Sequence, residues 1–380
     1  MRFSVTRFFA AGSIPFFALA LSSFATAPAP IKIGEIEPLS GKEAAFGQSS
    51  HRGILLAIEE INSRGGVLGQ PLQVLTQDNQ SKPGESATIA KKLIGRDRVV
   101  AVIHGGTSSQ CLEAAPFCQN ARIPFIATTA TAPQVTEMGT YIFRTCFIDP
   151  FQGGVLAKFS RQTLKAKRAA LLTSASSSFS VGLAKVYRDS FTAAGGTIAG
   201  EQKYAEGDKD FRAQLTALRS LDPDVIVAMG YYTEGGLICR QARDLGIKAP
   251  IVSADGWEAP ELIEIGGAGV DGAYYSSHYS SESTSPAVQA FLKKYRAKFG
   301  GVTPDSLAPL AYDATLLLAD AITRAGTVEG PKLREAIAAT KDYPGVTGRT
   351  TIDARRNASK PAVMIAVKNG RTHFVETIDP

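Results

Sequence analysis

The feature that most constrains this chain is an alternation of short apolar runs with stretches of helical period. Ile31–Ile36 reads as a first strand, and it is followed by a helix through Gly53–Asn62 whose apolar residues recur at helical spacing. Further strands are expected at Leu72–Thr76, Val99–Ile103 and Ile123–Ala127, with helices at Ala87–Leu93 and Leu112–Asn120. Strands that alternate with helices in this way predict a parallel sheet covered by helices.

The same alternation then starts again further along the chain. Strands are expected at Arg168–Leu172, Thr197–Tyr204, Val225–Met229 and Pro250–Ser253, with helices near Val181–Ala194, Phe211–Ser220 and Leu237–Leu245. Two successive series of similar length predict an α/β protein with two Rossmann-like lobes, each built on a parallel sheet. The C-terminal third predicts helices at Pro286–Phe299, Ser306–Arg324 and Pro331–Thr340, and two late strands, near Thr350–Ile352 and Ala362–Val367, that finish the chain. These late elements must return to one lobe or the other, so several crossings between lobes are expected.

The N-terminal end has the layout of a secretory signal peptide. Arg2 and Arg7 form a basic region, the following stretch to Phe24 is mostly apolar, and Ala25–Ala27 has the small-x-small pattern that signal peptidase accepts. A single membrane anchor is the alternative, but the apolar stretch is short and interrupted for a span of roughly 20 residues. We therefore expect residues 1–27 to be removed on export, which leaves 353 of the 380 residues for two lobes. The expected lobes are 31–147 with 280–345, and 148–279 with 346–380.

Charge and cysteine content exclude several classes of partner. Loss of residues 1–27 removes two arginines and no acid, which lowers the net charge from +6 to +4, and the remaining Lys and Arg are scattered among acids. A nucleic-acid surface needs a basic patch or stripe, so none is expected. Cys111 and Cys118 would lie roughly 10 Å apart on one helix, beyond the ~7 Å limit for a disulfide. With Cys146 and Cys239 dispersed and no CxxC present, we expect buried free thiols, no metal site and no cofactor.

Polar residues follow four of the expected strands, at the edge where open α/β sheets bind ligands. Residues 104–109 (HGGTSS) and 128–131 (TTAT) offer hydroxyls, and the first loop leads into a helix whose N–H groups suit an anion such as a carboxylate. Taken alone, either loop is also explained by ordinary N-capping. Residues 230–234 (GYYTE) and Asp255 with Trp257 come from the second series. A carboxylate with aromatic walls is what an ammonium group requires.

Signatures of catalysis are missing. The chain has no GxSxG, P-loop or HExxH pattern, and its Gly-rich loop at 104–106 does not match a dinucleotide fingerprint. The sequence therefore favours a binding protein over an enzyme.

Several linked segments resemble the periplasmic leucine/isoleucine/valine-binding family, the type I solute-binding proteins of ABC importers. They include PLSG at 38–41, AIEEIN at 57–62, GGVLG at 65–69, ATAP at 130–133, Phe143-Arg144, Gly230-Tyr231, RQAR at 240–243 and GVTG at 345–348. Their order and spacing, over essentially all of 31–370, are specific to that family. The resemblance implies two lobes joined by a hinge that close on a ligand.

The resemblance also implies a role for individual residues. Ser108, Thr129 and Thr131 would hold the α-carboxylate from the first lobe, with Thr107 as a competitor for the place of Ser108. Asp255 matches the acidic residue that pairs with the α-ammonium.

The remaining positions concern the side chain of the ligand. Tyr231 matches a tyrosine that reaches the ligand, whereas Phe46 and Phe179 stand where the best-known members have tyrosines. Leu307 falls near an apolar wall, and Trp257 would fill space or stack on a ligand. The loss of two hydroxyls makes the expected pocket more apolar.

The expected function is therefore capture of an amino acid (branched-chain, other aliphatic or aromatic) in the periplasm and delivery to the membrane permease subunits of an ABC importer. A ligand sensor of the same fold, for amides, urea or aromatic acids, is an alternative. A secreted α/β hydrolase is a further alternative from another class.

Overall fold

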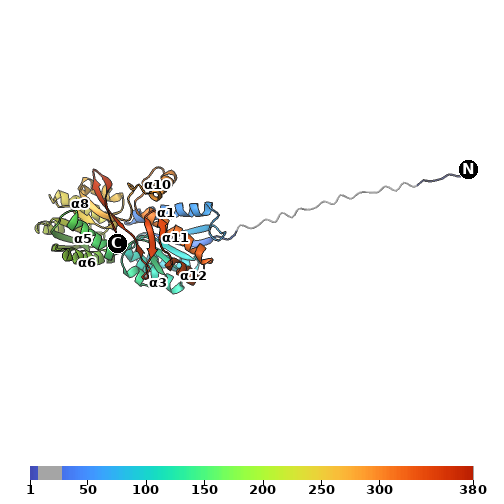
Figure 1. Cartoon of the computed structure of the whole chain (residues 1–380), viewed down its shortest axis with the longest axis horizontal. Coiled ribbons are helices and arrows are strands. Elements are labelled where there is room, and N and C mark those ends of the chain that lie inside the picture. The colour runs from blue at the N-terminus through green and yellow to red at the C-terminus, as the bar shows by residue number, and fades with distance from the viewer. Residues whose placement is uncertain (7–27, 380) are drawn as a thin grey trace.

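The computed structural model describes residues 1–6 and 28–379, so the predicted signal peptide falls largely on residues 7–27, outside the described part. Figure 1 shows two α/β lobes side by side, with the C-terminus between the labelled helices of the two lobes. The two-lobed α/β fold with parallel sheets is confirmed. None of the helices in the described part is long and apolar enough to cross a membrane.

The first lobe contains a five-stranded sheet in the order β2-β1-β3-β4-β5, in which every pairing is parallel. Its strands are β1 (Ile31–Glu37), β2 (Leu72–Asp78), β3 (Ala101–His104), β4 (Phe125–Ala127) and β5 (Ile142–Arg144). The first four confirm the predicted strands to within a few residues, and β5 was not predicted. Parallel pairing brings the carboxyl ends of all five strands to one edge.

Helices cover both faces of this sheet. On one face α1 (Ala44–Ser63), α11 (Leu307–Ala325) and α12 (Gly330–Ala338) pack on apolar residues that include Ile33 and Ile103. On the other, α2 (Glu85–Gly95) and α3 (Ser108–Ala121) pack on the alternate residues of the same strands, and α4 (Gln134–Glu137) is a single short turn before β5.

The second lobe contains a seven-stranded sheet in the order β15-β14-β10-β9-β8-β6-β7. Its strands are β6 (Arg168–Ser174), β7 (Thr197–Tyr204), β8 (Val225–Met229), β9 (Ile251–Ser253), β10 (Ala273–Ser277), β14 (Ala362–Lys368) and β15 (Arg371–Ile378). The first five run parallel, whereas β14 and β15 are antiparallel additions at one edge. The prediction that the chain finishes with β14 was wrong, because a turn at Asn369–Gly370 leads into β15, whose polar residues hide its period.

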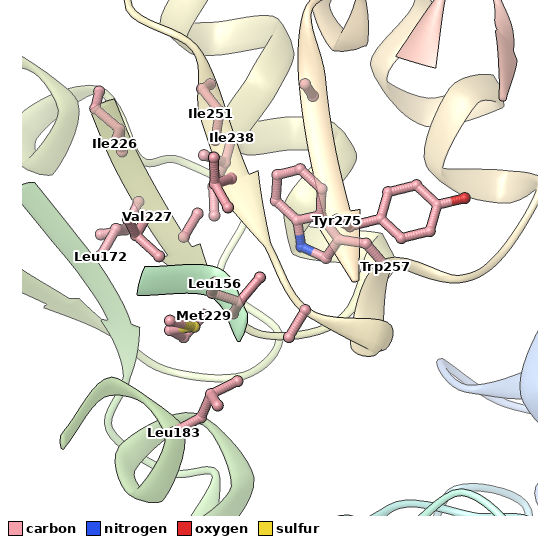
Figure 2. Close-up of a cluster of buried hydrophobic side chains, with 14 of the residues drawn as sticks. Leu156, Leu172, Leu183, Ile226, Val227, Met229, Ile238, Ile251, Trp257 and Tyr275 are labelled. Carbon is pink, nitrogen blue, oxygen red and sulfur yellow. The ribbon is translucent and has the colours of Figure 1, made fainter. Parts of the chain in front are cut away.

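The core of the second lobe forms between this sheet and its helices. These are α5 (Asp149–Gln162), α6 (Ser178–Ala193), α7 (Arg212–Arg219), α8 (Tyr232–Asp244), α9 (Glu261–Gly266) and the 3₁₀ turns η1 (Asp255–Trp257) and η2 (Gly267–Val270). Figure 2 shows Leu172, Val227 and Ile251 on neighbouring strands, with Trp257 and Tyr275 packed at one side of the cluster. Burial on both sides explains why the central strands read as continuous apolar runs.

The chain crosses between the lobes after β5, after β10 and before β14. After the second crossing α10 (Pro286–Lys298) packs against α1 and α11. A small sheet of β11 (Tyr343–Gly345), β12 (Gly348–Ile352) and β13 (Ala358–Ser359) precedes the third crossing. Ile352 and Ala358 lie in the first lobe's core, although the sequence analysis assigns 346–380 to the second lobe. We therefore propose that the second lobe resumes near Ala362.

A buried carboxylate holds the start of this last segment. Asp313 of α11 accepts hydrogen bonds from the backbone N–H of Val346 (2.8 Å), the N–H of Thr347 (2.8 Å) and the Thr347 hydroxyl (2.7 Å). The buried Lys360 ammonium donates to the same hydroxyl at 2.5 Å. The chain on the approach to the last crossing is thus fixed to a helix of the first lobe.

The cysteines are free and buried, as predicted. Cys111 and Cys118 lie on α3 and pack in the apolar core of the first lobe. Burial raises the pKa of Cys118 to about 12, which keeps it a thiol.

The contact between α1 and α11 depends on a glycine. A Cβ atom at Gly53 of α1 would lie 2.0 Å from the carbonyl oxygen of Ala308 in α11. Only glycine therefore allows the two helices to approach this closely.

We expect Gly53→Ala to lower the free energy of unfolding by about 1–3 kcal/mol, because α1 and α11 must move apart. The matched control is Gly154→Ala in α5, where no atom lies within 4 Å of the added Cβ. That variant should gain about 0.5–1 kcal/mol from its better helix propensity. Thermal unfolding measures both, and equal melting temperatures for the two variants would contradict the packing argument.

Candidate functional site

A cavity lies between the lobes at the carboxyl ends of their strands. Gly106 and Gly256 line it together with nine of the ten residues singled out in the sequence. These nine are Phe46, Thr107, Ser108, Thr129, Thr131, Phe179, Tyr231, Asp255 and Leu307. Its volume is about 20 Å³, room for little more than one water molecule. The walls from the two lobes therefore close tightly on each other, and a larger ligand enters only when they move apart.

The start of α3 forms the polar wall of the first lobe. Thr107 caps this helix: its hydroxyl accepts from the Gln110 N–H (3.4 Å), and the Gln110 side chain accepts from the Thr107 N–H (3.1 Å). The N–H groups of Ser108 and Ser109 follow, and the first N–H groups of a helix have no partner inside it. Ser108 accepts a bond from the Ala132 N–H at 3.3 Å, which leaves its own proton available to a ligand. Thr107 and Ser108 each accept a bond from a backbone N–H, so the hydroxyl protons of both competitors remain available to a ligand.

The loop after β4 supplies the other two hydroxyls. Thr129 donates to the Gly106 carbonyl at 2.9 Å, which ties this loop to the loop before α3, and Thr131 is buried beside it. The buried Arg144 of β5 donates to the carbonyls of Ala130 (2.6 Å) and Ala132 (2.7 Å) from beneath. Arg144 thus fixes the shape of the loop without lining the cavity.

The second lobe contributes a buried carboxylate. Asp255 begins η1 directly after β9, and one of its oxygens accepts from the Gln152 amide at 2.7 Å. Its other oxygen lies 3.0 Å from Nε2 of His278. Burial lowers the pKa of His278 against the opposing effect of Asp255, so the ring is neutral and donates from Nε2. Neither partner neutralises the carboxylate, and its remaining lone pairs can still accept from a cation.

The sequence analysis missed Gln152 and His278, which hold the Asp255 carboxylate beside the cavity. Gln152 lies on α5 and His278 directly follows β10, and neither element was predicted. His278 stacks on Phe147, with ring centroids 3.8 Å apart. A polar residue directly after β10 would have been the available signal, had that strand been recognised.

Aromatic rings from both lobes form the apolar wall. The rings of Phe179 and Tyr231 stack at 5.5 Å, and Phe46 meets Tyr231 edge-on at 5.9 Å. Leu307, the first residue of α11, completes this wall. Burial raises the pKa of Tyr231 well above its ordinary value, so its hydroxyl stays neutral. The wall therefore offers apolar contact with a single hydroxyl.

Trp257 does not line this cavity. Figure 2 shows its ring in the core of the second lobe beside Tyr275. In a 3₁₀ turn, side chains two residues apart point in different directions, so Trp257 turns inward when Asp255 faces the cavity. Of the two expected roles, it fills space: a Cβ at Gly235 would lie 2.5 Å from its ring.

Direct contacts between the lobes flank the cavity. The Tyr232 hydroxyl accepts from the Ala45 N–H (3.3 Å) and donates to the Lys42 carbonyl (2.8 Å), and Lys42 pairs with Glu206 at 2.7 Å. Ser306 donates its N–H to Glu258 at 3.2 Å. These contacts hold the lobes in a closed arrangement.

Within residues 1–6 and 28–379, no cluster of three or more His, Cys, Asp or Glu side chains could hold a metal ion.

Known proteins are similar to this chain in both sequence and fold. A model of the periplasmic binding protein family matches residues 30–372. The chain is 32% identical over 336 residues to the Leu/Ile/Val-binding protein BraC3 of Rhizobium johnstonii, covering 87% of this chain and 90% of that protein.

Two crystal structures are similar over nearly their whole length. The leucine-binding protein LivK from Thermotoga maritima has 38% identity and a TM-score of 0.88, covering 92% of this chain and 99% of that one. The branched-chain amino acid transporter substrate-binding protein LivJ from Streptococcus pneumoniae, in complex with isoleucine, has 36% identity and a TM-score of 0.88, covering 92% and 100%.

Proposed function

We propose, because the chain belongs to the periplasmic binding protein family, that it captures an α-amino acid with an apolar side chain between its lobes and presents it to an ABC importer. The observation that carries this proposal is one cavity with hydroxyl and N–H donors on one lobe and an unneutralised carboxylate on the other. The names of the relatives, which specify Leu/Ile/Val, leucine and isoleucine, support the same ligand class.

In this proposal the first lobe binds the α-carboxylate. The free hydroxyl proton of Ser108 and the N–H groups at the start of α3 donate to it, with support from Thr129 and Thr131. Helix N-termini favour negative charge, and charge-assisted bonds are stronger than neutral ones. Thr107 caps the helix and, because it lines the same cavity, stays a competitor for the place of Ser108.

The second lobe binds the α-ammonium through Asp255. Gln152 and His278 hold both oxygens of this carboxylate in place, so its side chain loses little conformational entropy when the ligand binds. Burial of either Asp255 or the ammonium without the other would leave an unpaired charge, which is energetically unfavourable. The ligand therefore stabilises the closed arrangement by joining two half-sites.

The side chain of the ligand would replace contacts among Phe46, Phe179, Tyr231 and Leu307. Phenylalanine at two of these positions favours aliphatic or aromatic side chains over those that need a hydroxyl partner. Branched-chain, other aliphatic and aromatic amino acids are the candidates.

We further propose that the protein works outside the cytoplasm after removal of residues 1–27, and that the closed form docks on the importer's permease subunits. The family is one of binding proteins, and we assign no catalytic role. The lobe boundaries proposed here are 31–147 with 280–361, and 148–279 with 362–380.

The test of the function is a thermal-shift panel on protein unfolded and refolded to remove any carried ligand. Leucine, isoleucine, valine and phenylalanine are compared with aromatic acids, amides and urea. A ligand at 100 times its Kd adds about 2.7 kcal/mol to the free energy of unfolding, which gives a clear shift. A shift only with ligands that lack an ammonium would overturn the proposal.

Asp255→Asn should weaken binding of the preferred amino acid more than about tenfold in calorimetry, because breaking a buried ion pair costs about 3–5 kcal/mol. The control is Glu234→Gln, a buried carboxylate of the same lobe that accepts from the Gly207 N–H at 2.7 Å and lies outside the cavity lining. Its affinity should match that of the unchanged protein. Equal losses in the two variants would remove Asp255 from the ammonium role.

Ser108→Ala should weaken binding of the amino acid more than binding of its carboxyl amide, because only the carboxylate loses a charge-assisted bond. Ser109→Ala is the neighbouring control, since Ser109 is exposed and meets only Ser178 across the lobes, at 3.5 Å. Calorimetry with both ligands measures the difference. A loss of the same size for acid and amide would show that Ser108 does not bind the carboxylate.

A further inference from the structure

A second and larger cavity lies between the lobes and has no role in the proposed function. Its volume is about 440 Å³, within the range of small-molecule sites. The first lobe contributes Ser49 and Arg52 of α1 and the loop before α11. The second contributes residues 258–261 and the start of β15. None of the residues expected from the sequence to bind a ligand lines it.

Two acids, one from each lobe, line this cavity. Glu258 is 6% exposed; one of its oxygens accepts from the Ser306 N–H at 3.2 Å, and the other is buried without a hydrogen-bond partner in the described chain. Asp305 accepts from the Leu307 N–H at 2.9 Å and from the Ser49 hydroxyl. Throughout the described residues, no Lys, Arg or His lies within ion-pair distance of either acid.

The environment of these acids disfavours their ionised forms, which a nearby positive charge would stabilise. Burial, reinforced by Asp305, raises the pKa of Glu258 to about 8, and burial raises the pKa of Asp305 to about 6. Other charged groups also line the cavity: Arg52, Glu261, Arg371, and the pair of Glu282 and His373. In this pair Oε1 of Glu282 lies 3.3 Å from Nδ1 of His373. The unsatisfied part of the cavity is thus its acidic end.

Aromatic rings identify the kind of cation. Tyr275, Tyr279 and Tyr295 line the same cavity, and tyrosine faces attract ammonium groups whose alkyl parts also gain apolar contact. A metal ion fits less well, because no suitable cluster of three ligands exists among residues 28–379. The combination of two acids and three tyrosines in one lining suits an organic cation instead.

We propose that this cavity binds a small organic ammonium ion, with its charge between Glu258 and Asp305 and its alkyl groups against the tyrosines. Because the two acids belong to different lobes, the bound cation stabilises the closed arrangement. Coupling between sites is reciprocal, so the cation and the amino acid each raise the affinity for the other.

Calorimetry with 1,4-diaminobutane and with tetramethylammonium tests the proposal, with sodium chloride at equal ionic strength as the control. We expect saturable binding of at least one of these amines with a Kd of about 1 mM or tighter. Glu258→Gln keeps an oxygen for the Ser306 N–H but should weaken that binding about tenfold or more. The matched control is Glu282→Gln. Glu282 lines the same cavity, but its carboxylate is already paired with His373, so this change should alter the Kd by less than about twofold.

A second measurement separates the acids from general charge effects. Binding should release a proton from Glu258 near neutral pH, so the heat should change between buffers of different ionisation enthalpy, and Asp305→Asn should weaken binding as Glu258→Gln does. The proposal is overturned if neither amine binds saturably below about 10 mM, or if both acid variants bind as the unchanged protein does. Amino-acid affinity measured in the same samples tests the proposed function separately.

Discussion

The candidate site depends on the buried Arg144. Its guanidinium sits under the loop after β4 and binds two backbone carbonyls, which fixes where Thr129 and Thr131 stand. A buried cation without a carboxylate at ion-pair distance is costly, and burial lowers the pKa of Arg144 accordingly. The cost is offset by these carbonyl bonds, so the loop and the arginine hold each other. The segments 130–133 and 143–144, noted separately in the sequence, are two parts of one arrangement.

The two half-sites differ in how they are prepared. The first lobe presents donors built from backbone and hydroxyls, whose positions follow from the cap of α3 and from Arg144. The second presents Asp255, held by two side chains that leave its charge unneutralised. Each half is incomplete on its own, and the lobes meet through only a few direct polar contacts, such as Tyr232 with Lys42. A ligand that carries both charges completes the two halves together.

Much of this arrangement was predictable from sequence because burial leaves a strong pattern. The buried strands β1 and β8 read as apolar runs, and the polar loops that follow the strands gather at one edge. The three-residue β5, the glycine pair inside α5 and the polar β15 lack such a pattern, so they were missed. Gln152 was missed with α5, and His278 was missed with the unpredicted β10; their contacts with Asp255 join distant segments of the chain. For Trp257 the sequence left two roles open, and the 3₁₀ turn after β9, which turns the ring into the core of the second lobe, favours filling space.

The interleaved path of the chain has a consequence for the order of synthesis. The five strands of the first sheet are complete at residue 144, but α11 and α12, which cover one of its faces, come at 307–338. The helix α1 covers part of that face early. At about 5–20 residues per second, the part that α11 and α12 cover stays exposed for roughly 10–40 s on the ribosome. A chain that cannot close its first core early is slow to become compact in the cell that makes it. Delayed compaction would suit the proposed export, in which the chain crosses a membrane before it folds.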